Sequence, residues 1–227
     1  SSHDLISDEE PVFQSTRYNL YRQSLDTLSD QNNAYACPCS RKYLKDHHGI
    51  HHEKCLKQLN DISQFALKFR VNTGSEYTWE DKLQGLQSRK LEEDFVLQRK
   101  EGFYAYQLAV VCDDIEQNIS HVVRGFDLID STPMQLALYH AMTTAPPQFS
   151  HFPVIVYPNG QKLSKQNLAT AVNNALALKN LLKIFTVIGL DLKHTPDNCK
   201  NALNEALECW HTQFLIGKSE LIQHSHF

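Results

Sequence analysis

Over residues 121–135 the chain reads HVVRGFDLIDSTPMQ, a stretch that predicts a short strand followed by a helix. Its apolar opening favours a strand over His121–Val123 that ends at Arg124-Gly125. Ser131-Thr132-Pro133 then offers a helix cap followed by proline, which is favoured at the first position of a helix. We expect this helix to run toward Ala145, where two prolines end it.

Further strands are predicted on both sides of this stretch. Residues 106–112, YQLAVVC, are apolar in succession, which is typical of a strand covered on both faces, and we expect them to form the central strand. Apolar and polar residues alternate from Phe65 to Val71, as in a half-buried strand. Asp94–Gln98 and Phe152–Tyr157 are expected to form two more strands.

Helices are predicted toward both ends of the chain. Near the start, with Ser15 and Thr16 as candidate caps, apolar residues recur at spacings of three and four: Tyr18, Tyr21, Leu25 and Leu28. A second stripe contains Ala171, Ala175, Leu178, Leu182 and Phe185. A third helix is expected to begin at Thr195-Pro196 and to turn inward Leu203, Leu207, Trp210 and Phe214. Strands interleaved with helices favour an α/β core that carries insertions and a helical end.

Composition excludes some classes of protein. With a net charge of −4, the chain lacks the basic surplus on which non-specific nucleic-acid binding depends. Its longest apolar runs fall far short of the roughly 20 residues of a membrane-spanning helix. No secretory signal opens the sequence, and cysteine usage in a chain of this size favours a reducing compartment. We therefore expect a cytoplasmic protein without membrane contact.

Cys37, Cys39, His51 and Cys55 lie within one short segment and form a candidate metal site. Three thiolates and an imidazole complete a tetrahedral zinc site with no open position, so the predicted zinc is structural. His47, His48 and His52 compete with His51 for the fourth place. The alternative is a set of ordinary buried cysteines beside exposed histidines. The remaining cysteines, Cys112, Cys199 and Cys209, fit apolar core patterns.

Residues 160–166, GQKLSKQ, form a candidate phosphate-binding loop. Lys162 and Lys165 place two ammonium groups on a flexible turn, which can neutralise charge that develops on a triphosphate. A solvated surface turn is the alternative reading of the same residues.

Tyr106 and Arg124 are candidate substrate-binding residues. Tyr106 stands at the entry to one predicted strand and Arg124 ends the next, so the phenol and the guanidinium could converge at one sheet edge. Arginine binds carboxylates as a two-pronged fork, which suits an amino-acid substrate. The alternative is a structural ion pair of Arg124 with Asp113 or Asp114.

Several strings in this order resemble the glutamate branch of the class I aminoacyl-tRNA synthetases. They are FRV at 69–71, DFVLQRKEG at 94–102, YQLAVV at 106–111, the stretch 121–135, and KLSKQ at 162–166, which resembles the KMSKS loop of that class. The cysteine pattern and the short C-terminal region resemble the glutamyl-queuosine tRNA(Asp) synthetases, which are truncated relatives of the glutamyl-tRNA synthetases.

The resemblance implies a class I, Rossmann-like α/β catalytic core whose N-terminal part is missing, with an inserted zinc-binding subdomain and a helical C-terminal region. It divides the chain into residues 1–35, a remnant of the nucleotide-binding core, and 36–60, the zinc-binding insertion. Residues 61–150 would be the glutamate-site half, and 151–227 would hold the KMSKS-like loop and the C-terminal helices. A histidine-glycine signature is expected before Phe13, and the HGIH at residues 48–51 is not a substitute because it lies in the cysteine loop.

The resemblance also implies an activity. The enzyme would use ATP, with Mg²⁺, to activate L-glutamate and would transfer it to the queuosine base in the anticodon of tRNA(Asp). Tyr106 and Arg124 would contact glutamate, and Lys165, helped by Lys162, would hold the ATP phosphates. A monomer is expected. Two alternatives remain: a fragment of a glutamyl-tRNA synthetase, or a zinc-stabilised tRNA-binding module without catalysis.

Overall fold

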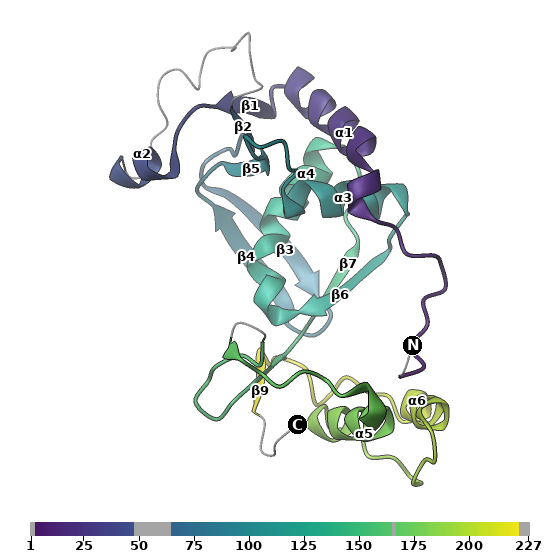
Figure 1. Ribbon diagram of the computed structural model, residues 1–227. Coiled ribbons are helices and arrows are strands. Elements are labelled where there is room, and N and C mark those ends of the chain that lie inside the picture. Colours follow the sequence, from purple (N-terminus) through teal and green to yellow (C-terminus); the bar gives the residue numbers. More distant parts are fainter. Residues whose placement is uncertain (1–2, 48–64, 165–166, 223–227) are drawn as a thin grey trace.

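The computed structural model describes residues 3–47, 65–164 and 167–222 (Figure 1). The helices are α1 Tyr18–Asp30, α2 Arg41–Asp46, α3 Tyr106–Glu116, α4 Thr132–Ala141, α5 Ala177–Val187 and α6 Cys199–Glu208. The strands are β1 Ala34–Cys37, β2 Ala66–Phe69, β3 Ser75–Asp81, β4 Gly85–Leu91, β5 Phe95–Gln98, β6 His121–Gly125, β7 Gln148–Phe152, β8 Val154–Val156 and β9 Glu220–Ile222. Short 3-10 turns include η1 Gln14–Thr16, η3 Phe126–Ser131 and η5 Asn174–Leu176.

The strands form three sheets within the described residues. The sheet that positions the site has the order β4-β3-β7-β6. In it β6 and β3 both run parallel to β7, so their carboxyl ends meet at one edge, while β4 returns antiparallel to β3. A second, antiparallel sheet has the order β1-β2-β5, and a third joins β8 to β9 in parallel.

The main core lies where helices α1, α3 and α4 pack against the β1-β2-β5 sheet (Figure 1). Its fully buried side chains come from each of these parts and include Tyr21, Leu25, Leu28, Leu97, Leu108, Val111 and Leu138. A separate small core joins α5 to α6 at the other end of the molecule. No helix within the described residues is long and apolar enough to cross a membrane.

The segment YQLAVVC, for which we expect a central strand, forms the first two turns of helix α3, so this prediction is wrong. A continuous apolar run does not separate a buried strand from a buried helix. Here the run is apolar on successive residues because α3 lies between α1, α4 and β5 and is covered on most sides. The buried residues of this segment are one, three or four positions apart, which is the spacing of a wide helical face: Leu108, Ala109, Val111 and Cys112.

Other predicted elements are confirmed with shifted ends. Strands β2, β5 and β6 lie where expected, and so do helices α1 and α4, although α4 ends at Ala141. Ser15 and Thr16 lie in η1 and do not cap α1, whose N-cap is Arg17 without a side-chain bond. The strand expected over 152–157 is split by Pro153, because proline removes a ladder hydrogen bond.

The C-terminal helices differ more from expectation. Helix α5 begins only at Ala177. Helix α6 begins at Cys199, where the Asn198 side chain accepts a bond of 2.8 Å from the Asn201 amide and supplies the cap. It buries Cys199, Ala202 and Ala206. Of the residues predicted to face inward, Leu203 packs against this core, whereas Leu207 is 75% exposed, so the predicted inward face is only partly correct. The sequence pattern misled because the smaller residues form the contact with α5.

We predict that Leu108→Ala lowers the free energy of unfolding by about 2–5 kcal/mol, because the side chain is fully buried in the main core. Leu86→Ala is the matched control, since Leu86 is 76% exposed, and its effect should stay within about 0.5 kcal/mol. Urea unfolding followed by circular dichroism measures both. Equal losses in the two variants would contradict the described core.

Candidate active site

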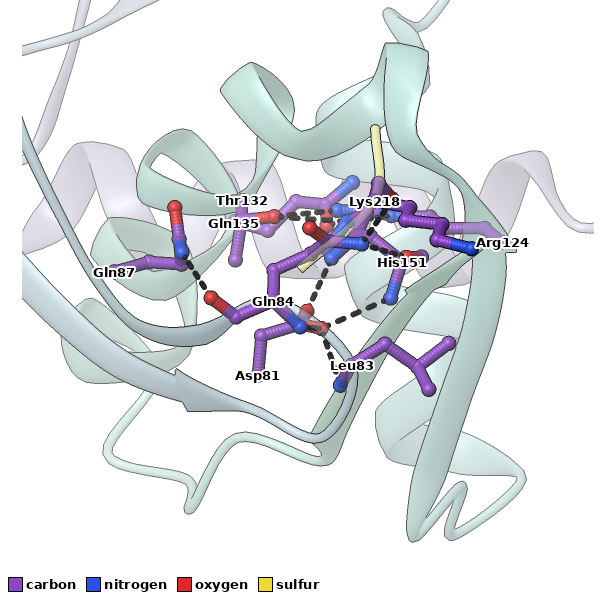
Figure 2. Close-up of polar contacts among 9 residues, drawn as sticks. All are labelled: Asp81, Leu83, Gln84, Gln87, Arg124, Thr132, Gln135, His151 and Lys218. Atoms are coloured by element: carbon purple, nitrogen blue, oxygen red, sulfur yellow. Dashed lines mark hydrogen bonds and ion pairs between the residues drawn. The ribbon is translucent and has the colours of Figure 1, made fainter. Parts of the chain in front are cut away.

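The candidate site lies at the carboxyl edge of the β4-β3-β7-β6 sheet. Arg124 stands near the end of β6, directly opposite His151 of the parallel strand β7. Asp81 ends β3 at the same edge. In α/β proteins, ligands bind outside the carboxyl ends of parallel strands, so this edge is where a substrate site is expected. Figure 2 shows these side chains together with two from α4.

Neutral groups from three elements hold the Arg124 guanidinium. Its Nε donates to His151 Nε2 at 3.0 Å, Nη1 to Gln135 Oε1 at 2.8 Å, and Nη2 to Thr132 Oγ1 at 2.8 Å (Figure 2). The Tyr106 side chain at the start of α3 lies close enough to raise the pKa of the guanidinium. Gln135 is itself fixed, because its Nε2 donates to Gln107 Oε1 at 2.9 Å.

The charge of Arg124 is therefore not neutralised locally. Burial lowers the pKa of the guanidinium, while Tyr106 and the more distant Asp114 carboxylate raise it. It forms no salt bridge with any residue that the structure describes. A half-buried cation surrounded by neutral partners is a favourable site for a carboxylate, because each guanidinium Nη has a second N–H.

The alternative structural pairs of Arg124 are not formed. Asp113 instead binds Arg17 Nε at 2.7 Å and the Tyr21 hydroxyl at 2.9 Å, which ties α1 to α3. Asp114 accepts from the Tyr139 hydroxyl at 3.0 Å, and burial raises the pKa of its carboxyl group. Both carboxylates thus serve the packing of α3.

Tyr106 and Arg124 converge, as the sequence suggests, although Tyr106 begins a helix and not a strand. Tyr106 is 46% exposed, so its ring borders solvent beside a guanidinium that is partly covered. The pair combines one aromatic hydroxyl with one cation at an accessible edge.

A buried pair, Asp81 and His151, supports Arg124, and sequence reasoning missed both residues. Their side chains are 0% exposed, and His151 Nδ1 lies 2.5 Å from Asp81 Oδ2. Burial lowers the pKa of His151, and together with the nearby Arg124 charge it outweighs the hydrogen bond to Asp81, which raises that pKa. Burial opposes ionisation of Asp81, but hydrogen bonds from the His151 side chain and from backbone amides outweigh it and lower the pKa of the carboxyl group. The pair is therefore a carboxylate with a neutral imidazole.

The lysine loop is attached to the same edge. Lys162 Nζ donates to Asp127 Oδ2 at 2.5 Å, and Asp127 lies in η3, three residues after Arg124. Gly125 makes this approach possible, because a Cβ there would lie 2.5 Å from Asp127 Oδ1. The loop leaves β8 through a turn in which Gly160 has a φ of +80°. Lys165 lies outside the described residues.

Only part of the candidate zinc site can be located. Cys37 is buried at the end of β1, and Cys39 follows it two residues later, partly exposed. Cys37 lies opposite Ala66 of β2, so the chain leaves and returns at one place. His51 and Cys55 lie outside the described residues, and no group of three metal-binding side chains occurs within those that are described.

Comparison with known proteins places this geometry in a family. Residues 3–220 match the catalytic domain of the class I tRNA synthetases (E and Q). The chain is 36% identical over 216 residues to the glutamyl-Q tRNA(Asp) synthetase of Idiomarina loihiensis, covering 92% of this chain and 75% of that protein. The chain belongs to the glutamyl-Q tRNA(Asp) synthetase family, within the class I tRNA synthetases.

Another relative agrees with this family assignment, and a solved structure agrees with the fold. The glutamyl-Q tRNA(Asp) synthetase of Chromobacterium violaceum is 40% identical over 209 residues, covering 87% of this chain and 68% of that protein. The crystal structure of glutamate-tRNA synthetase from Elizabethkingia anophelis superposes with a TM-score of 0.74 at 17% identity, covering 98% of this chain and 56% of that one. The chain thus spans about half the length of that solved synthetase. The expected class I α/β catalytic fold is confirmed.

In this family member the neutral state of His151 predicts sensitivity to acid. Its pKa is lowered in the folded chain but ordinary, near about 6.5, in the unfolded chain. As pH falls from about 7 to about 5 the unfolded chain binds the proton first, which costs up to about 1.4 kcal/mol of stability per pH unit. His151→Gln should remove this part of the pH dependence in urea unfolding. Identical slopes for the two proteins would contradict a neutral buried imidazole.

Proposed function

We propose that this chain carries the catalytic centre of an enzyme that activates L-glutamate with ATP and transfers it to the queuosine base in the anticodon of tRNA(Asp). The names of the relatives support this substrate and this acceptor. The observation that carries the proposal is the uncompensated Arg124 charge, which lies at the same sheet edge as the attachment of the lysine loop.

The positive charge of Arg124 would attract a carboxylate group of glutamate. The second N–H groups on Nη1 and Nη2 of Arg124 face no carboxylate of the described chain, and Tyr106 adds a hydroxyl beside them. A substrate carboxylate bound there would gain charge-assisted hydrogen bonds without displacing an existing ion pair. This arrangement favours a small acidic substrate over a neutral one.

ATP would lie toward the lysine loop. A glutamate carboxylate oxygen attacks the α-phosphorus, and pyrophosphate leaves with the electron pair of the broken bond. Lys162 and Lys165, together with Mg²⁺ bound to the phosphates, would stabilise the charge that develops on the leaving group. A queuosine hydroxyl then attacks the glutamyl-adenylate, and AMP leaves. Because Lys162 is paired with Asp127 in this structure, binding of ATP would compete for that ammonium group.

Structural zinc belongs to the same proposal. Cys37, Cys39, His51 and Cys55 would hold it, and the return of the chain from Cys37 to Ala66 supports a closed insertion at this point. A soft thiolate set suits zinc. When bound, zinc would stabilise the fold of the insertion and take no part in the reaction.

The remaining proposals concern the domain division of the chain, its oligomeric state and its cellular location. We retain the division into residues 1–35, 36–60, 61–150 and 151–227 as part of the nucleotide-binding core, the zinc insertion, the glutamate-site half and the loop with its helices. A monomer acting in the cytoplasm, where ATP and tRNA(Asp) are available, fits this activity.

The activity is tested by glutamate-dependent exchange of pyrophosphate into ATP by the full-length protein without tRNA. We expect Arg124→Gln to lower kcat/KM for glutamate by about 100-fold or more, equivalent to about 2.7 kcal/mol of transition-state stabilisation. Arg22→Gln is the matched control, because Arg22 lies on α1 with a side chain that is 65% exposed, and it should leave the exchange unchanged.

Two outcomes would contradict the proposal. Equal rates in wild type and Arg124→Gln would remove Arg124 from the site. Tight tRNA binding with no exchange at all would favour an RNA-binding module without catalysis. Transfer of labelled glutamate to tRNA(Asp) that contains queuosine, and to no other tRNA, identifies the acceptor.

Zinc is tested by metal analysis of the full-length protein under reducing conditions. We expect about one zinc per chain, loss of zinc in Cys37→Ser, and a lower Tm after chelation. Cys209→Ser is the control, because Cys209 lies at the end of α6, far along the chain from the insertion. Full zinc content in Cys37→Ser would refute the ligand set.

A further inference from the structure

The orientation of the Asp81 carboxylate is fixed by the backbone around it. Its Oδ1 accepts from the amides of Leu83 at 3.1 Å, Gln84 at 3.0 Å and His151 at 3.1 Å. Only Oδ2 remains for the imidazole, at 2.5 Å from His151 Nδ1 (Figure 2). Since an ionised carboxylate has no proton to donate, the proton between the two groups belongs to Nδ1.

The other ring nitrogen of His151 is therefore an acceptor. Arg124 Nε, 3.0 Å from Nε2, carries a proton at all accessible pH values and can only donate. A lone pair on Nε2 satisfies that donor, whereas a proton on Nε2 would set one N–H against another. The hydrogen-bond partners on both sides thus require the same neutral tautomer.

Hydrogen bonds also fix the backbone around the pair. The Gln84 side chain donates from Nε2 to the carbonyl oxygens of His151 and Lys218, both at 2.8 Å, which joins the β3–β4 turn to β7 and to the segment before β9. Figure 2 shows Leu83 and Gln84 of this turn beside Asp81 and His151. Both side chains are fully buried, so no water competes for their hydrogen bonds.

We propose that Asp81 and His151 are positioning residues that orient Arg124 for the substrate carboxylate by keeping the imidazole neutral, with its proton on Nδ1. This inference rests on the proposed binding of glutamate by Arg124. His151 fixes Nε from β7, while Thr132 and Gln135 fix the two Nη atoms from α4. The orientation of the guanidinium plane is then fixed before the substrate binds. Less conformational entropy of the Arg124 side chain is therefore lost on binding.

The decisive variant is Asp81→Asn. The three backbone amides keep the amide oxygen of asparagine at the Oδ1 position, so the NH₂ group must face His151 Nδ1. It donates there, which moves the imidazole proton to Nε2, against Arg124 Nε–H. We expect KM for glutamate in the exchange reaction to rise at least about tenfold, with KM for ATP changed by less than about twofold.

A second variant distinguishes this positioning role from a purely structural one, in which Asp81 only stabilises the β3–β4 turn by accepting from the backbone amides of Leu83 and Gln84. Glutamine in place of His151 can turn its amide oxygen toward Arg124 whatever group stands at position 81. We expect the double variant Asp81→Asn/His151→Gln to bind glutamate more tightly than Asp81→Asn alone. A purely structural role predicts the reverse order, because each change adds a defect to the same buried turn.

The wild-type protein offers an independent readout. Nitrogen NMR of ¹⁵N-histidine-labelled protein near neutral pH should show His151 as a neutral ring with an unprotonated Nε2, assigned by the signal missing from His151→Gln. A ring protonated on Nε2, a KM in Asp81→Asn within about twofold of wild type, or a double variant no better than Asp81→Asn would each overturn the proposal. Absence of exchange in wild type would instead refute the proposed function.

Discussion

The parallel pairing of β6 with β7 places Arg124 directly opposite His151, and the site depends on this register. A slip of one residue would turn each side chain of β6 to the other face of the sheet. Thr132 and Gln135, three residues apart at the start of α4, approach Arg124 only from that face. The half-buried cation and its neutral partners therefore follow from the alignment of two short strands and from helix α4 between them in the sequence.

Sequence reasoning located the segments of the site better than its hydrogen bonds. The strand that ends at Arg124 and the following helix were predictable, because a strand pattern and a Ser-Thr-Pro helix start occur close together. Thr132 and Gln135 were detectable in principle, since they share one face of that helix. Asp81 and His151 were not, because they meet only through the pairing of β3 with β7, which no local pattern encodes.

The errors in the fold have a common cause. Helix α3 was predicted as a strand because its residues are apolar in succession. They are apolar because the helix is buried on many sides, by neighbours that are distant in the chain. The β3–β4 hairpin was missed because β4 is largely polar and exposed, which hides the alternation of a strand. The inner face of α6 was misread because close packing against α5 selects small residues. Tertiary contacts overrode local preference in each case.

The pairing of β8 with β9 has a consequence for the order in which the chain folds. Strand β8, which leads into the lysine loop, has its partner in Glu220–Ile222, and α5 and α6 lie between the two strands in the sequence. Closing so long a loop carries an entropic cost that nearby contacts do not repay. We therefore expect the base of the lysine loop to form late in folding, after the intervening helices have brought the chain back to β8.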